Sequence, residues 1–212
     1  IREKLQLHSS ISKQAARSRA IELLDEVGIP DPAKRVDQYP HEYSGGMRQR
    51  AIIAMALSLN PALLIADEPT TALDVTIQAQ ILDLLERLRQ THNSSIIVIT
   101  HDMGVVSEIA SQVLVMYAGR AVERSSKDSL FKSPQHPYTK GLMNSVPRID
   151  RARTSRLETI SGQPASLLNL PVGCAFQARC PQVKPACSKV PPFIADSQGF
   201  GAACILLEEG VH

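Results

Sequence analysis

Residues 43–74 read YSGGMRQRAIIAMALSLNPALLIADEPTTALD, and this stretch decides the fold. It begins with a Ser-Gly-Gly turn that opens a helix, which Asn60-Pro61 terminates. Residues 63–66 then form an apolar run typical of a buried parallel strand. Two adjacent carboxylates, Asp67 and Glu68, follow it directly. We therefore expect an α/β protein in which a helix and a strand deliver polar groups to a phosphate-handling site.

A βαβ unit is the next expected feature. Apolar residues recur on one helical face of the following segment, at Ile77, Ile81, Leu84, Leu85 and Leu88. Residues 96–100, IIVIT, are β-branched and predict a second strand. A right-handed crossover through the helix makes the two strands parallel. Two later strands, 113–117 and 120–123, are predicted around a tight turn at Ala118-Gly119.

The outer parts of the chain differ in character. Apolar residues at helical spacing predict a helix over residues 13–27, and Asp31-Pro32 is expected to cap a short second one. After about Ser125 the chain holds most of its prolines and all its cysteines, which indicates a loop-rich appendage. We expect two domains, 1–124 (a helical subdomain, 1–60, and a catalytic core, 61–124) and 125–212.

Composition excludes several functional classes. With 43% hydrophobic and 21% charged residues, the chain resembles an ordinary globular protein. The net charge of +2 is spread along the chain, so no nucleic-acid partner is expected. The uncharged stretch 51–66 is cut by Asn60-Pro61 and is too short for the roughly 20 residues that span a bilayer. Because the sequence starts at Ile1 with a charged segment, we interpret it as a fragment without a secretory signal.

A phosphate-binding loop of the G-x-x-x-x-G-K-[ST] type is missing from the sequence. None of the 11 glycines is followed by lysine. The sequence therefore offers groups that could act on a phosphate without the loop that usually cradles one.

The acidic pair and a histidine are the candidate catalytic groups. Ligands bind beyond the carboxyl ends of strands in α/β sheets, where Asp67 and Glu68 lie. One acid suits Mg²⁺ and the other can polarise an attacking water. His101 follows the second strand and is expected at the same edge, within reach of a terminal phosphate. The alternatives are solvated loop acids and a polar strand cap, and the wording DEPTTALD after four apolar residues favours function.

Ser44, Gly45 and Gly46 form a candidate anion site. Helix N-termini present free N–H groups to anions, and glycine lets a phosphate approach the backbone closely. An ordinary serine N-cap is the alternative.

The motifs resemble those of ABC-type ATPases. YSGGMRQR resembles the signature loop, LLIADEP the Walker B strand, TALD the D-loop and THD the switch histidine, all in the family's order. The longer wording, including VMYAGR and HPYT, is similar to the ATP-binding subunits of dipeptide and oligopeptide importers and their nickel and glutathione relatives. The resemblance implies a partial ABC-type nucleotide-binding domain with a helical subdomain, a parallel sheet core and a cysteine-containing extension.

A mechanism follows from this resemblance. In the family ATP lies between two subunits, one supplying the P-loop and the other the signature loop. Ser44, Gly45 and Gly46 would then touch the γ-phosphate of nucleotide held by a second ATPase subunit, and Asp74 would link the subunits. Asp67 would organise Mg²⁺, Glu68 would be the general base, and His101 would contact the γ-phosphate.

The resemblance also implies partners and a location. Integral-membrane permease subunits, and indirectly an extracytoplasmic substrate-binding protein, would act with the ATPase at the cytoplasmic face of the plasma (inner) membrane. The P-loop is expected upstream of Ile1, so the fragment alone should be inactive. The alternatives are a soluble, non-transport ABC ATPase, which usually has two cassettes or a coiled-coil insertion, and a non-enzymatic truncated remnant.

Four cysteines mark the tail: Cys174, Cys180, Cys187 and Cys204. Their spacing, C-x5-C-x6-C-x16-C, lacks the C-x2-4-C knuckles of a zinc site. Free thiols, zinc and an iron–sulfur cluster stay open on the residues alone. The tail resembles the extension of the same importers, some of which carry a [4Fe–4S] cluster on four such cysteines. The nearby His136-Pro137-Tyr138 predicts a turn into a short helix over 138–144, with no catalytic role.

Overall fold

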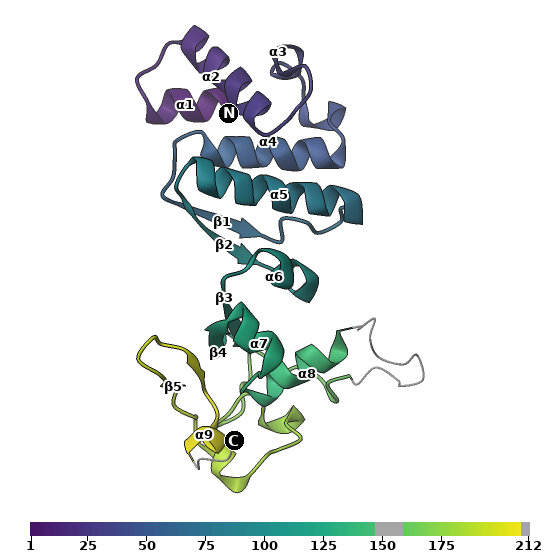
Figure 1. Ribbon diagram of the computed structural model, residues 1–212, viewed down its shortest axis with the longest axis vertical. Coiled ribbons are helices and arrows are strands. Elements are labelled where there is room, and N and C mark those ends of the chain that lie inside the picture. The colour runs from purple at the N-terminus through teal and green to yellow at the C-terminus, as the bar shows by residue number, and fades with distance from the viewer. Residues whose placement is uncertain (147–158, 209–212) are drawn as a thin grey trace. The chain divides into compact units, whose positions relative to one another are not determined.

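The computed structural model describes residues 1–146 and 159–208. Its contacts divide the chain into two compact units, Ile1–Val105 and Val106–His212, which we describe separately (Figure 1). The predicted boundary between 124 and 125 stays a prediction.

Helices and a two-stranded sheet make up the first unit. Its elements are α1 (Arg2–His8), α2 (Lys13–Glu26), α3 (Pro32–Arg35), the 3₁₀ turn η1 (Pro40–Glu42), α4 (Gly45–Leu57), β1 (Leu63–Asp67), α5 (Val75–Thr91) and β2 (Ser95–Ile99). Helix α6 (Met103–Ile109) runs across the division between the units. The predicted βαβ unit is confirmed, because β1 and β2 pair in parallel with Leu63 opposite Ser95 and Asp67 opposite Ile99.

The core of this unit lies between helices and one face of the sheet. Buried side chains of α5 pack with those of α2 and α4 and with Leu64 of β1. Figure 1 shows α4 and α5 side by side next to the two strands. Four of the five apolar residues predicted for the buried face of α5 are at most 2% exposed, and Ile77 packs against their edge.

The opposite face of the sheet carries exposed apolar side chains. Leu63 and Ile65 on β1 are 47% and 60% exposed, and Ile97 and Ile99 on β2 are 49% and 48% exposed. Strand periodicity puts these four residues on one face, together with Asp67. Asp67 therefore projects from the exposed side of the strand at its carboxyl end.

Helix starts in the first unit follow the expected chemistry with one correction. Ser12, Ser44 and Asp74 cap α2, α4 and α5 with their side-chain oxygens. Asp31 stands at the N-cap of α3 but adopts φ 49° and makes no side-chain cap bond. The expected aspartate cap is therefore wrong in its mechanism, because the left-handed backbone does not bring the carboxylate to the first free N–H groups.

The second unit centres on an antiparallel sheet. Its strands are β3 (Gln112–Tyr117), β4 (Arg120–Ser126), β5 (Ile194–Ala195) and β6 (Gly201–Ala202), in the order β3-β4-β6-β5. The predicted hairpin is confirmed, and Ala118 and Gly119 both take positive φ, as a two-residue I′ turn requires. The pairing of β6 with β4 was not predicted. It joins the cysteine-containing tail to the hairpin.

Short helices complete this unit: α7 (Lys127–Lys132), α8 (Pro137–Ser145), α9 (Ile205–Glu208) and the 3₁₀ turns η2 (Gln177–Arg179) and η3 (Pro185–Ser188). The predicted helix over 138–144 is confirmed to within one residue at each end. Across the described ranges, none of the helices has the length and apolar composition needed to traverse a bilayer.

Candidate nucleotide site and cysteine pocket

Glu68 lies at the carboxyl end of β1 and contacts the group that follows β2. Its N–H donates to the carbonyl of Ile99 at 2.9 Å, so the parallel ladder continues one residue beyond the strand. Its φ of 48° is uncommon for a residue other than glycine. Strained backbone of this kind clusters at functional sites.

Glu68 and His101 form a contact across the sheet edge. The His101 Nδ1 and Glu68 Oε1 lie 2.8 Å apart, and the Thr71 hydroxyl donates to Glu68 Oε2 at 2.6 Å. The Thr71 hydrogen bond, and then that from His101, lower the pKa of Glu68. The Glu68 hydrogen bond and its negative charge raise the pKa of His101. Because the two side chains are 37% and 82% exposed, the pair is open to a ligand.

The Ser-Gly-Gly turn is a helix N-terminus with two different glycines. Ser44 Oγ accepts the N–H of Met47 at 3.3 Å. The N–H groups of the two residues that begin α4, Gly45 and Gly46, do not take part in this cap. A Cβ on Gly46 would lie 2.9 Å from Ile77 Cγ2, so Gly46 allows α4 to approach α5. A Cβ on Gly45 would meet only Leu73 at 3.8 Å. Close packing of two helices therefore requires a glycine at position 46, whereas position 45 has room for a side-chain carbon.

Asp74, which was predicted to link two subunits, caps helix α5. Its carboxylate accepts the N–H of Ile77 at 2.9 Å and caps α5. The side chain is exposed, so this cap leaves its second oxygen accessible.

Two side chains beside the signature loop turn out to hold the helices together. Tyr43 donates from its hydroxyl to the carbonyl of Arg35 at 2.8 Å, and its ring packs against the core. Arg50 donates to the carbonyl of Val27 at 2.5 Å, at the end of α2. Both residues lie within the YSGGMRQR motif, and the sequence alone assigned neither of them a contact.

The predicted residues fall into two groups in this unit. Asp67, Glu68 and His101 gather at the carboxyl edge of the sheet. Residues 1–105 are all described, and within them no hydrogen bond joins the Ser44 turn to Glu68 or His101. Thr71 is a contact that sequence analysis missed, although it lies within the DEPTTALD motif.

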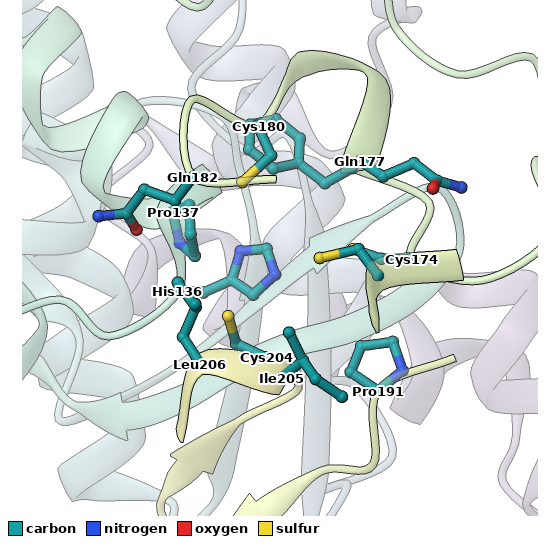
Figure 2. A pocket seen from close by; sticks show the side chains of 12 residues that line it. His136, Pro137, Cys174, Gln177, Cys180, Gln182, Pro191, Cys204, Ile205 and Leu206 are labelled. Carbon is teal, nitrogen blue, oxygen red and sulfur yellow. The ribbon is translucent and has the colours of Figure 1, made fainter. Parts of the chain in front are cut away.

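The four cysteines line one pocket in the second unit. Pro137, Pro191, Phe176, Ile205 and Leu206 supply most of its apolar wall. Figure 2 shows the sulfur atoms of Cys174, Cys180 and Cys204 directed toward the pocket from three separate segments. The backbone brings a fourth segment close, because the N–H of Cys174 donates to the carbonyl of Cys187 at 2.9 Å. Burial raises the pKa of Cys174, Cys180 and Cys204.

His136 also lines this pocket and is held by a buried carboxylate. The ring is 1% exposed, and burial, with a smaller effect of Lys140, lowers its pKa to about 4. Glu123 in β4 is also 1% exposed and accepts the N–H groups of Gln135 and His136 at 2.9 and 2.8 Å. The sequence predicted only a turn into a short helix here, because the contact of Glu123 with His136 depends on how the chain folds back after β4 and α7.

Two profiles of known protein families match parts of this chain. The ABC transporter family profile matches residues 2–71, and the profile for the oligopeptide/dipeptide transporter C-terminal region matches residues 122–187. The chain therefore belongs to the ABC transporter family, in the branch with the oligopeptide/dipeptide C-terminal region.

Named relatives agree with this membership. A putative peptide import ATP-binding protein of Brucella melitensis is 53% identical over 215 residues, covering 99% of this chain and 64% of the relative. The oligopeptide transport ATP-binding protein of Salmonella typhimurium is 53% identical over 202 residues, covering 95% of this chain and 60% of the relative. The chain thus spans less than two thirds of the length of these curated relatives.

A solved structure shares the fold. A putative metal-chelate type ABC transporter in an inward-facing conformation aligns with a TM-score of 0.54 and 25% sequence identity. The alignment covers 62% of this chain and 52% of the other. The expected ABC ATPase-like arrangement of helices and sheet is therefore confirmed.

Proposed function

We propose that the chain forms part of the energy-coupling ATPase subunit of a peptide importer. In this role it works with a second ATPase subunit, which is either a copy or a paralogue, and with membrane permease subunits. An extracytoplasmic binding protein delivers the peptide, and the ATPase lies peripherally on the cytoplasmic face of the membrane. The likeness to import proteins over at least 95% of the chain supports this role.

The Glu68–His101 contact is the single observation that carries the enzymatic part. The two side chains come from positions 33 apart and meet at 2.8 Å at the ends of neighbouring parallel strands. A carboxylate whose pKa is lowered stays ionised and can accept a hydrogen bond from an attacking water. The imidazole beside it, with a raised pKa, can donate to a phosphate oxygen. Asp67, on the adjacent exposed face, is suited to hold Mg²⁺ with ATP.

The Ser44–Gly46 turn and Asp74 serve the other half of this site. The free N–H groups at the start of α4 would bind the γ-phosphate of nucleotide held by the second ATPase subunit. The lack of a hydrogen bond from this turn to Glu68 or His101, within residues 1–105, fits service to two separate nucleotides. The exposed Asp74 would contribute to the contact between subunits.

Replacing Glu68 tests the proposal. In the importer assembled with its permease and partner ATPase, Glu68→Gln should lower ATP turnover by about 10² or more, because a positioned general base contributes about 10²–10⁴. The matched control is Glu86→Gln on α5, another carboxylate that accepts side-chain hydrogen bonds, here from Arg89. Turnover by Glu68→Gln equal to that of the control would refute the assignment.

A second test uses the 212-residue chain by itself. Because the sequence has no G-x-x-x-x-G-K-[ST] loop, we propose that this chain alone neither binds ATP tightly nor hydrolyses it. Steady ATP turnover by the purified chain, abolished by Glu68→Gln, would contradict this.

For the cysteine pocket we propose a [4Fe–4S] cluster. Four thiols from separate segments line one pocket, and four cysteine thiolates are the usual ligand set. In residues 1–146 and 159–208 no group of three or more His, Cys, Asp or Glu side chains is placed to hold a metal ion. A cluster differs, since each thiolate binds a different iron. When bound, it supplies a crosslink and a one-electron centre.

Metal analysis decides this proposal. Protein purified without oxygen should contain about four iron and four acid-labile sulfide per chain, as the cluster's formula requires. Stoichiometric zinc without iron and sulfide would exclude the cluster.

A further inference from the structure

The two ring nitrogens of His136 have different surroundings. The residue is the N-cap of α8, and its Nδ1 accepts the N–H of Tyr138 at 3.0 Å. An Nδ1 that accepts a hydrogen bond carries a lone pair, so the ring proton lies on Nε2. The helix cap therefore determines the tautomer.

In residues 1–146 and 159–208, the hydrogen bond of the His136 ring is the one that Nδ1 accepts, and none joins Nε2 to an oxygen or nitrogen atom. Figure 2 shows the imidazole among the side chains that line the pocket, which include the four cysteines. The two glutamines of the lining do not compete for it, because Gln177 and Gln182 extend away from the pocket in the same view. Gln177 also donates to the carbonyl of Val172 at 2.6 Å. The sulfur atoms of the four cysteines are acceptors that line the same pocket.

The ring is held in place from three sides. The His136 N–H donates to the buried Glu123, Pro137 fixes the backbone that follows, and Phe176 packs with its ring centroid 5.9 Å from the imidazole. Because the ring is 1% exposed, it has no solvent-facing orientation to turn into. An N–H group on the wall of such a pocket is stabilised by an acceptor within the pocket.

We propose that His136 is a positioning residue that donates a hydrogen bond from Nε2 to a sulfur atom of the group held by Cys174, Cys180, Cys187 and Cys204. This inference rests on the proposed cluster. Hydrogen bonds to sulfur tune the reduction potential of a cluster. An N–H donor stabilises the more negatively charged, reduced form, so His136 makes the potential more positive.

Two substitutions separate the donor from the cap. In His136→Asn the side-chain oxygen can still accept the Tyr138 N–H, since asparagine is among the best N-cap residues, but no donor reaches the sulfur atoms. In His136→Gln the longer amide can return an N–H toward the pocket while the cap is lost. Donor and cap are therefore removed one at a time.

Redox titration of the loaded protein measures the effect. His136→Asn should lower the potential, and each tenfold change in the ratio of reduced to oxidised protein corresponds to about 59 mV for one electron. His136→Gln should restore part of the shift. An unchanged potential in His136→Asn with the cluster loaded would overturn this inference alone, as would equal shifts in both variants. Absence of iron and sulfide from the wild-type protein would overturn the cluster as well.

A measurement on the wild-type protein avoids any folding defect of the variants. His136 is the one histidine among the described residues that line the pocket. Pulsed electron paramagnetic resonance of the reduced, ¹⁵N-histidine-labelled protein should therefore show a nitrogen coupled to the cluster. A spectrum without this coupling would also overturn the inference.

Discussion

Gly173→Ala should open the cysteine pocket, because this glycine makes room for the segment that carries Cys187. Gly173 has φ +92°, and a Cβ there would lie 2.4 Å from the Cys187 carbonyl oxygen and 2.5 Å from the Ser188 carbonyl carbon. Both atoms belong to the backbone and cannot rotate away. The same Cys187 carbonyl accepts the N–H of Cys174.

The expected loss of stability can be estimated from these contacts. The left-handed backbone costs an L-residue about 1–2 kcal/mol. Moving the Cys187 carbonyl breaks a hydrogen bond worth about 1 kcal/mol. The sum of about 2–3 kcal/mol corresponds to a roughly 30- to 150-fold increase in the open population. Gly162→Ala is the control, since Gly162 has φ +78° but its nearest neighbour is an Arg179 side-chain carbon at 3.5 Å.

Thiol labelling of the metal-free protein reports this opening. Cys187 is 8% exposed, so a thiol reagent reaches it only when the pocket opens. Labelling of Cys187, followed by mass spectrometry, should be about 30- to 150-fold faster in Gly173→Ala than in wild type. The increase in Gly162→Ala should be about tenfold, from the backbone term alone. Equal rates in the two variants would show that the Cβ clash has no effect.

Two further predictions concern the nucleotide site. The pair of His101 with Glu68 stabilises the fold most between about pH 4.5 and 6.5, since it is lost as pH rises through the raised pKa of His101 or falls through the lowered pKa of Glu68. Histidine NMR titration should therefore give His101 a higher pKa in wild type than in Glu68→Gln, and equal values would contradict the contact. Gly46→Ala should destabilise the protein by about 1 kcal/mol through its contact with Ile77. Gly45→Ala should change the free energy of unfolding by no more than about 0.5 kcal/mol, yet it should reduce ATP turnover of the assembled importer about tenfold, the effect of one lost phosphate hydrogen bond. Urea unfolding measures the stability of both variants, and an ATPase assay measures turnover. Full turnover by Gly45→Ala would argue against phosphate binding at this glycine.

Local patterns predicted most of the first unit. The apolar period of α5 and the β-branched run of β2 are local patterns, so the sequence predicted both elements. The crossover through α5 then predicted that β1 and β2 pair in parallel. The strand limits shifted by one residue, with β1 ending at Asp67 and β2 at Ile99. Strands β5 and β6 have two residues each, too few for a periodic pattern in the sequence. They form because β6 pairs with the edge of β4 and β5 pairs with β6.

The candidate site was predicted in its residue types and only partly in its contacts. The sequence motifs predicted Glu68 and His101 as site residues. The hydrogen bond from Thr71 to Glu68 appears only in the structure. Gly46 was predicted only as a phosphate contact, and its close packing against Ile77 appears only in the structure.

The sequence by itself determined the family, the βαβ unit and the identity of the polar groups, because motifs and periodicity are local properties of the chain. Only the tertiary structure decided which of those groups meet. The 2.8 Å contact of Glu68 with His101, and the placing of His136 among cysteines up to 68 positions away, depend on strand pairing and burial over long separations. No local pattern encodes such distances, since they arise from the packing of whole elements.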